Sequence, residues 1–440
     1  MNSTTSLSVH RPGDAAYDAA CAGFDLSAVP TPDLAVSATS EADVAAAVRY
    51  AADRDLPISV RATGHGTVPL ADRGVLIDTR GLSSVTVDAG ARTAVVGAGV
   101  KWTRVLAESG PLGLSPLCGS SSDVGAVGYT LGGGLGPLGR RHGWSADHVR
   151  RFRLGTAAGE VREVSADTDP ELFWGLRGGG GGFGVVTEME IDLEPAADLY
   201  GGALYLPGEA APEVLAEFAR ATAAAPDELS LSVAFLTFPG IDAVPAPLRG
   251  RFVSDLRVTY QGDRGEAEAL IAPFRAIASP LLDTVRPLPI TELSTVHNDP
   301  VHPQPVRSGS AVLPQSAGEV GRILLDEIRA TTPYMLEVRH LGGALVRPAG
   351  VDNAVGHRAA PFSLFTSAYP GPKIDAAADL QAALYRRLAP WTGGRVLYNF
   401  AAGPVDLHAC FDEPTATRLR ALKQDLDPQN LLRYTVATIL

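Results

Sequence analysis

A glycine-rich passage from Gly119 to Gly136 constrains this chain more than any other stretch. It reads Gly-Ser-Ser-Ser-Asp-Val-Gly-Ala-Val-Gly-Tyr-Thr-Leu-Gly-Gly-Gly-Leu-Gly. Glycines let backbone N–H groups approach a bound anion closely, and the serines and Asp123 between them favour turns over strands. The passage is too long for a hairpin and too ordered in its spacing for a linker. We therefore predict a cradle for a diphosphate.

The composition is that of a folded protein with a large core. The 440 residues suggest two or three domains, and 45% of them are hydrophobic. The net charge of −12 argues against nucleic acid or an anionic membrane as a partner. The three cysteines, at 21, 118 and 410, have the spacing of neither a disulfide framework nor a metal site. Met1–Leu26 lacks a signal-peptide pattern and no apolar stretch reaches spanning length, so we expect a cytoplasmic protein.

Hydrophobic periodicity predicts an α+β chain of two lobes. The first 30 residues are polar and loop-like, and Ser40-Glu41-Ala42-Asp43 opens a capped helix. We expect strands at 56–60, 74–78, 84–88, 93–99, 149–154, 160–164, 183–187, 189–193, 230–236, 256–261 and 334–341. We expect further helices at 101–109, 171–176, 213–224, 266–278, 316–331, 374–388 and 414–425. A change of composition at 194–198 marks the boundary between the lobes.

The glycine run at 132–136 does not indicate a nicotinamide-binding domain. That fold places its glycines in a tight turn between a strand and a helix, with an acidic residue further along the unit. Neither feature is present around Gly132–Gly136.

The order of several motifs is more specific than any one of them. After a strand comes Arg61-Ala62-Thr63-Gly64-His65-Gly66, then the glycine-rich passage, Leu172-Phe173-Trp174-x-Leu176-Arg177 with its following glycines, Phe183-Gly184-Val185-Val186-Thr187, Asn399-Phe400 and Asp427-Pro428-x-Asn430. This set resembles flavoproteins with a p-cresol methylhydroxylase-type FAD-binding domain, and among them the berberine bridge enzyme-like oxidases, which include 6-hydroxynicotine and sugar oxidases. The resemblance runs from about Leu34 to the C-terminus and is strongest over 40–195.

The resemblance implies a domain organisation. An N-terminal segment at 1–30 precedes a PCMH-type FAD-binding domain at 31–197. A substrate-binding domain at 198–390 has an antiparallel sheet covered by helices, and a C-terminal segment at 391–440 returns to the FAD domain.

The resemblance also implies FAD held by a single covalent bond. His65 matches the histidine that bonds the 8α-methyl group of the flavin. At the second attachment point of many relatives, Ser121 stands in the cysteine's position and Tyr129 in the histidine's, while Cys118 lies three residues too early. The expected FAD-binding residues are Arg61, Ala62, Thr63, Gly64, His65, Gly66, Gly119, Ser120, Ser121, Ser122, Val124, Gly125, Gly128, Tyr129, Gly132, Gly133, Gly134, Gly136, Gly184, Val185, Val186 and Asn399.

Other interpretations of these residues stay open at this point. His65 alone is compatible with a structural histidine or a metal ligand, and the glycine runs with plain connectors. Arg61 either neutralises phosphate or is solvated. His297 and His302 lack a third ligand at suitable spacing, so we expect no metal.

The catalytic base is the least determined part of the site. Flavin oxidation of an alcohol or amine needs a hydride directed at N5 and a base for the other proton. The family's tyrosine in Tyr-x-Asn is replaced by Leu397, and Tyr398 falls on the opposite face of a regular strand. The candidates to replace it are Tyr129, Tyr398, and Glu337 together with Arg339. Glu337 shares with Arg339 one face of a strand that roofs the flavin in this family, where it transfers a proton, anchors substrate, or simply pairs with Arg339.

The expected function is an FAD-dependent oxidase of a small organic molecule, with dioxygen as electron acceptor. In the resembling family, a valine three residues after the cysteine position goes with oxidases, and here that residue is Val124. A flavin-dependent oxygenase of natural-product biosynthesis and a flavin-binding protein without turnover are the alternatives, the second favoured by Leu397.

Overall fold

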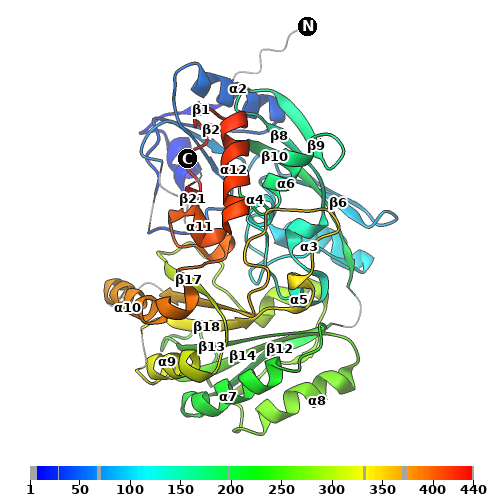
Figure 1. The fold of residues 1–440 in the computed structure, drawn as a ribbon, viewed down its shortest axis with the longest axis vertical. Helices are drawn as coiled ribbons and strands as arrows, with labels where there is room; N and C mark the ends of the chain where they lie inside the picture. The colour runs from blue at the N-terminus through cyan, green and yellow to red at the C-terminus, as the bar shows by residue number, and fades with distance from the viewer. Residues whose placement is uncertain are drawn as a thin grey trace.

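Two lobes stacked along the long axis make up the molecule (Figure 1). The computed structural model describes residues 7–27, 29–66, 71–196, 199–330, 333–368 and 374–438. The expected α+β fold, with an antiparallel sheet covered by helices in the second lobe, is confirmed.

The first lobe contains two sheets. The smaller has the order β1-β2-β4-β3, and its strands β2, β4 and β3 run parallel. Its strands are β1 (Val9–His10), β2 (Leu34–Ser37), β3 (Ile58–Arg61) and β4 (Val75–Asp78). Helix α2 (Glu41–Ala52) begins at the predicted cap, where Ser40 Oγ accepts from the Asp43 N–H and the Asp43 carboxylate accepts from the Ser40 N–H. This reciprocal pair fixes the start of the helix.

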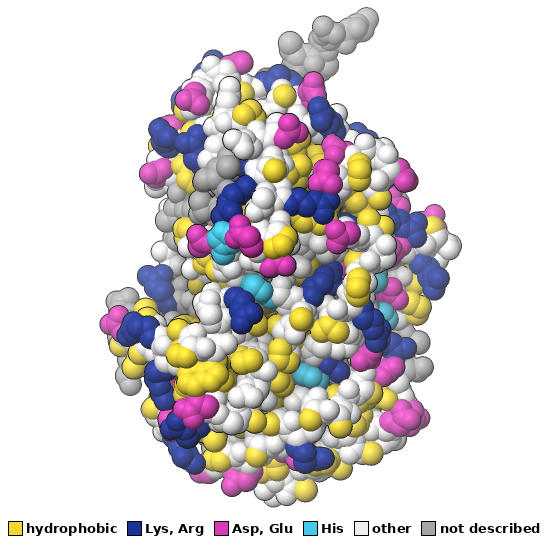
Figure 2. Space-filling view, viewed as in Figure 1, with side chains coloured by type: hydrophobic (Ala, Val, Ile, Leu, Met, Phe, Trp, Pro, Cys, Tyr) yellow, Lys and Arg dark blue, Asp and Glu magenta, His cyan; other side chains and the backbone are white. Residues whose placement is uncertain are grey.

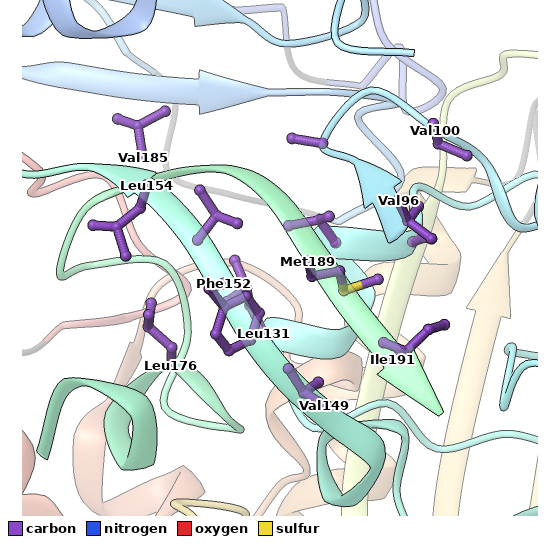
Figure 3. Packing of buried hydrophobic residues seen from close by; sticks show 14 of the residues in the cluster. Val96, Val100, Leu131, Val149, Phe152, Leu154, Leu176, Val185, Met189 and Ile191 are labelled. Carbon is purple, nitrogen blue, oxygen red and sulfur yellow. The ribbon is translucent and has the colours of Figure 1, made fainter. Parts of the chain in front are cut away.

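The second sheet of this lobe is antiparallel, in the order β5-β6-β10-β8-β9. Its strands are β5 (Val85–Asp88), β6 (Thr93–Gly97), β8 (Val149–Gly155), β9 (Val161–Ser165) and β10 (Val185–Asp192). Its inner face packs Phe152, Leu154 and Met189 with Leu131 and Leu176 (Figure 3). The other elements here are α3 (Trp102–Ser109), η1 (Gly110–Leu112), β7 (Leu114–Ser115), α4 (Ala126–Leu131), α5 (Gly139–His142), η2 (Ser145–His148), α6 (Pro170–Leu176) and β11 (Glu194–Pro195).

An eight-stranded antiparallel sheet organises the second lobe, in the order β15-β12-β14-β13-β18-β19-β17, with β16 also paired to β12. Its strands are β12 (Leu199–Pro207), β13 (Leu229–Thr237), β14 (Phe252–Gln261), β15 (Leu282–Asp283), β16 (Arg286–Pro287), β17 (Arg307–Leu313), β18 (Met335–His340) and β19 (Phe362–Ala368). Helices α7 (Ala211–Thr222), α8 (Arg264–Arg275), α9 (Gly318–Arg329) and α10 (Ile374–Thr392) cover the face turned away from the first lobe (Figure 1). Short η3 (Gly208–Ala210), η4 (Ile290–Val296) and η5 (Gly343–Val346) lie in the connections.

Strand alternation decides which side chains of this sheet reach the first lobe. In β18, Leu336 and Val338 pack into the core beneath the helices. Met335 and Arg339 therefore lie on the opposite face. That face closes the space between the lobes.

The C-terminal segment returns to the first lobe. It contains helices α11 (Leu407–Cys410) and α12 (Glu413–Leu426). Phe411 directly after α11, Leu419 of α12 and Leu431 after α12 belong to the first lobe's core. Strands β20 (Val405–Asp406) and β21 (Ala437–Thr438) pair in parallel. The C-terminal α12 thus lies against the N-terminal lobe (Figure 1).

Two sequence-based expectations were wrong. The segment 1–30 is not only loop: α1 (Ala15–Cys21) forms, and its Tyr17 and Cys21 pack on the smaller sheet. Residues 398–400 form a 3-10 turn, η6 (Tyr398–Phe400), so the strand alternation expected for Tyr398 does not apply.

The sequence did not predict helix α4 or strands β17 and β19. Helix α4 forms inside the glycine-rich passage because its apolar residues are buried, which outweighs the low helix propensity of glycine.

On the face shown in Figure 2, acidic and basic side chains are interspersed among apolar ones. Within the part of the chain that the structure describes, no helix combines the length and the apolar character needed to cross a bilayer.

Candidate flavin and substrate site

A cavity of about 460 Å³ lies where the two lobes meet. The first lobe contributes the loop after β3, the glycine-rich passage and the start of β10. The second lobe contributes β17, β18 and β19, and the C-terminal part contributes the 398–401 turn and 432–436. Of the predicted site residues, those at the cavity wall are Arg61, Ala62, Thr63, Gly64, His65, Gly66, Gly119, Ser120, Ser121, Val124, Gly125, Gly128, Tyr129, Gly184, Val185, Val186, Tyr398 and Asn399.

The imidazole of His65 is held at this wall without a hydrogen bond. Its ring stacks on Phe24, with centroids 4.1 Å apart and planes 12° from parallel. Both ring nitrogens are buried and lack a partner. Burial lowers the pKa of His65 to about 4, so the ring is uncharged at neutral pH. An uncharged imidazole with two unused nitrogens is suited to a bond with a ligand.

Glycine is required beside His65. Gly64 has a φ of +67°, and a Cβ there would lie 2.8 Å from the Cα of Gly23. Arg61 lines the cavity, but its guanidinium donates to the Cys21 carbonyl at 2.5 Å. The side chain thus ties α1 to the loop, and its expected contact with phosphate stays a prediction.

The glycine-rich passage divides into two parts with different roles. Its first part, up to Tyr129, borders the cavity, and in its second part Leu131 and Leu135 do so. The predicted residues Gly132, Gly133, Gly134 and Gly136 are not at the wall and pack against protein instead. A Cβ at Gly136 would lie 1.9 Å from the Cys118 carbonyl oxygen. Ser122 is likewise off the wall, where its carbonyl accepts a bond from Thr103.

The positions of a second flavin attachment are occupied by Ser121 and Tyr129, which both line the cavity. The Tyr129 hydroxyl is buried without a partner, and burial raises its pKa well above the usual value. Burial raises the pKa of the Cys118 thiol to about 12, and Cys118 is not at the wall.

The turn at 398–400 connects the C-terminal part to the glycine-rich passage. The Asn399 side chain accepts from the Gly134 N–H at 2.8 Å and donates to the Tyr129 carbonyl at 2.9 Å. These two bonds stabilise the turn at Tyr398–Phe400, where a strand was expected. Leu397 is buried in a small apolar cluster.

Glu337 is not at the cavity wall, although the sequence placed it among the catalytic candidates. Its side chain is 0% exposed, with Oε1 2.9 Å from Arg257 Nη1 and Oε2 2.9 Å from Arg339 Nη2. Burial alone would raise the pKa of Glu337, but Arg339 and Arg257 hold it well below its usual range. A carboxylate this strongly held in its charged form is a poor proton acceptor. The interpretation as a partner of Arg339 fits the geometry.

A buried row of alternating charge leads from β14 to the cavity. Arg257 Nε donates to Asp255 Oδ2 at 3.0 Å, and Glu337 joins Arg257 to Arg339. The row crosses β13 at Ala234, which is paired with both Asp255 and Glu337. This small residue leaves room for the charged side chains to meet. Of the four charged members, Arg339 reaches the cavity.

Sequence reasoning missed several residues that the second lobe contributes to the cavity. Asp299, Ser308, Phe365 and Ser367 all line it. Ser308 lies on β17, and Phe365 and Ser367 lie on β19, the two strands that were not expected. Asp299 lies in a loop, where Oδ2 accepts a bond of 2.7 Å from Ser120 Oγ. Alternation in 362–368 was the one signal that pointed to a strand.

Comparison with known proteins supports the resemblance to FAD-dependent oxidoreductases. A family model described as an FAD binding domain matches residues 32–165. The (R)-6-hydroxynicotine oxidase of Paenarthrobacter nicotinovorans is 29% identical, over 96% of this chain and 94% of that protein. A crystal structure of 6-hydroxy-D-nicotine oxidase from Arthrobacter nicotinovorans superposes with a TM-score of 0.84 at 25% identity, covering 98% of this chain and 97% of that one. The BBE-like 1 protein of Physcomitrella patens gives a TM-score of 0.82 at 22% identity, over 97% and 95% of the two chains.

The chain is an FAD-dependent oxidoreductase with the fold of the berberine bridge enzyme-like proteins. The cavity of this flavoprotein fits FAD by two independent features. Closely packed glycines border it, and buried polar atoms of His65 and Tyr129 at its wall have no partner. The described residues contain no group of three or more His, Cys, Asp or Glu side chains that could hold a metal ion.

Proposed function

We propose that this flavoprotein is an oxidase of a small organic molecule and carries its FAD on a single covalent bond to His65. The observation that carries the proposal is the imidazole of His65, buried at the cavity wall with both nitrogens unpartnered. Buried polar atoms are nearly always paired in folded proteins. A covalent bond through one nitrogen gives this ring the partner that the described residues do not supply. Because the ring is uncharged at neutral pH, it is available as a nucleophile.

The bond is proposed as single because the second attachment position holds Ser121. A serine hydroxyl lacks the thiolate character by which cysteine reacts. Tyr129 beside it has a raised pKa and stays protonated at neutral pH. Neither side chain is suited to a second bond.

The first lobe would hold the FAD, and the second would hold the substrate. The cradle consists of the 61–66 loop, the passage from Gly119 to Tyr129 and the Gly184–Val186 segment. When bound, FAD supplies a hydride acceptor for the substrate and passes two electrons to dioxygen, which with two protons becomes hydrogen peroxide. The protein must therefore orient a C–H bond and accept the proton that the substrate releases.

Asp299 is the proton acceptor that the geometry supports. Among the described residues, two carboxylates line the cavity, Asp25 and Asp299. Asp25 accepts bonds from the backbone N–H groups of Ser27 and Val306. Asp299 accepts one from Ser120 through Oδ2, which orients the carboxylate and leaves Oδ1 for a substrate O–H or N–H.

Val124 bears on the use of dioxygen. It lines the cavity with Gly125 next to it, so little bulk stands at this part of the wall. A larger side chain in a closely packed wall fills the space that oxygen would use.

The test of the proposed oxidase is rapid mixing of the photoreduced protein with aerated buffer. We expect the wild-type flavin to reoxidise quickly and Val124→Leu to slow it roughly tenfold or more, corresponding to about 1.4 kcal/mol. Val164→Leu, a buried change within β9 away from the cavity, is the control. Slow reoxidation of the wild-type protein contradicts an oxidase.

A further inference from the structure

The charged groups at the cavity wall are not equally available to a ligand. Arg61 donates to the Cys21 carbonyl, and Asp25 accepts from backbone N–H groups. Asp299 is bonded to Ser120 through Oδ2 and keeps Oδ1 for the substrate proton. Arg339 donates to Glu337 through Nη2, while its Nε is buried and has no partner among the described residues. A guanidinium has five N–H groups in a fixed fork, so Glu337 leaves most of its donors unused.

The row behind Arg339 fixes its charge and its position. Glu337 is shared between Arg257 and Arg339, at 2.9 Å from each. Arg257 is in turn paired with Asp255. The row therefore alternates in sign and presents its positive end to the cavity. These side chains are almost completely buried, and that of Arg339 is 12% exposed. The Arg339 guanidinium therefore cannot move away from the cavity without leaving the buried charge of Glu337 unpaired.

The surroundings of Arg339 are apolar and aromatic. Its guanidinium lies over the Phe400 ring, 5.0 Å from the centroid. Phe365 packs against Phe400 with centroids 5.6 Å apart, and Met335 lines the same wall. The stacking orients the plane of the guanidinium. The rings beside it offer a surface for the body of a flat apolar ligand.

From these observations we infer that Arg339 binds a carboxylate, so that the substrates of this enzyme are small aromatic acids. This inference rests on the proposed function, because it names the substrate class of the same cavity. The carboxylate receives N–H bonds from the fork of Arg339, and the ring lies against Phe365 and Phe400. Glu337 acts as a positioning residue that holds the fork and does not touch the substrate.

The test uses the purified flavoprotein and three probes: benzoate, its neutral analogue benzamide, and acetate. Binding is measured by calorimetry and by the change in the flavin absorption spectrum. We expect benzoate to bind at least tenfold more tightly than either other probe. Arg339→Gln should weaken benzoate roughly tenfold to a hundredfold, as for loss of a charge-assisted hydrogen bond, and leave benzamide unchanged. Arg339→Lys keeps the charge but not the fork, so its affinity for benzoate should lie between those of the wild type and Arg339→Gln.

The control is Arg54→Gln, an exposed arginine stacked on Tyr50 of α2, which should bind all three probes like the wild type. Equal affinity of the wild type for benzoate and benzamide would overturn the inference, as would unchanged benzoate binding in Arg339→Gln. Acetate binding as tightly as benzoate would overturn the aromatic part. Flavin content is measured in the same samples. Protein without flavin would refute the proposed function, while calorimetry would still decide the role of Arg339.

Discussion

At the scale of single residues, the site is marked by polar atoms that have no partner among the described residues. His65, Tyr129, Gln304 and Arg339 all line the cavity, and each has a buried nitrogen or hydroxyl without a hydrogen bond. An unpaired buried polar atom costs about 1–3 kcal/mol. Their occurrence around one cavity indicates that a ligand completes these groups.

Asp299 gives a prediction at this scale. Asp299→Asn keeps the size of the side chain and removes its ability to take a proton, so flavin reduction should slow by about 10²–10⁴. The rate is measured without air, with a compound that bleaches the wild-type flavin. Reoxidation of the photoreduced variant serves as the control and should be unaltered. A reduction rate equal to that of the wild type would remove Asp299 from the mechanism.

At the scale of elements, the second half of the glycine-rich passage acts as a packing joint. Gly132 and Gly134 lie against the Asn399 and Tyr129 side chains, and Gly136 lies against the Cys118 carbonyl. This close approach lets the 398–400 turn bond to the passage through Asn399. These glycines position the cradle without lining the cavity themselves.

Substitution of Gly136 tests this joint. A Cβ there would overlap backbone, so Gly136→Ala should lower the free energy of unfolding by about 1–3 kcal/mol or more, as other overpacked positions do. Urea unfolding of the purified protein measures it. Gly350→Ala, where a Cβ would meet no atom within 4 Å, should stay within about 0.5 kcal/mol of the wild type. Equal urea midpoints for Gly136→Ala and Gly350→Ala would show that the passage accommodates a Cβ at Gly136.

The sequence predicted elements that are specified locally and missed contacts made over long distances. The 61–66 loop follows a buried strand and carries its own glycine and histidine, so its place at the cavity was predictable. The burial of Glu337 depends on Arg257, 80 residues earlier on β14, and on small residues of β13 between them. No local pattern contains that information.

Other misses have the same cause. The 398–400 turn depends on the glycine-rich passage, more than 260 residues away, through Asn399. Strand β17 reads Arg-Ser-Gly-Ser-Ala-Val-Leu, and its polar first half, from which Ser308 lines the cavity, lacks a core pattern. Cavity walls of this kind escape reasoning from hydrophobic periodicity.

At the scale of the whole molecule, Arg140 of α5 joins the lobes. Its guanidinium donates to the Leu229 carbonyl at the start of β13 at 2.7 Å and to the Leu341 carbonyl, and it lies 3.2 Å from His340 Nε2. To accept from Arg140, His340 must be neutral. Burial, and then the charge of Arg140, lower the pKa of His340 to about 3.

This joint predicts a pH dependence of stability. Between pH 6.5 and 3 the unfolded state binds a proton at His340 that the folded state does not. Stability is therefore fully present above pH 6.5 and falls as the pH is lowered. Between pH 7 and 5, His340 lowers the free energy of unfolding by about 2 kcal/mol. In urea unfolding at both pH values, His340→Gln should lose less stability on acidification than the wild type. His408→Gln, an exposed site on α11, is the control. Parallel losses in wild type and His340→Gln would rule out His340 as the source.

The attachment of FAD to His65 is tested most directly by the intact mass of the acid-denatured protein. We predict that the wild-type chain carries the added mass of one FAD, that Ser121→Ala carries it too, and that His65→Ala has the mass of the bare polypeptide. A wild-type chain at the mass of the bare polypeptide, or a His65→Ala chain that retains the added mass, would contradict the account.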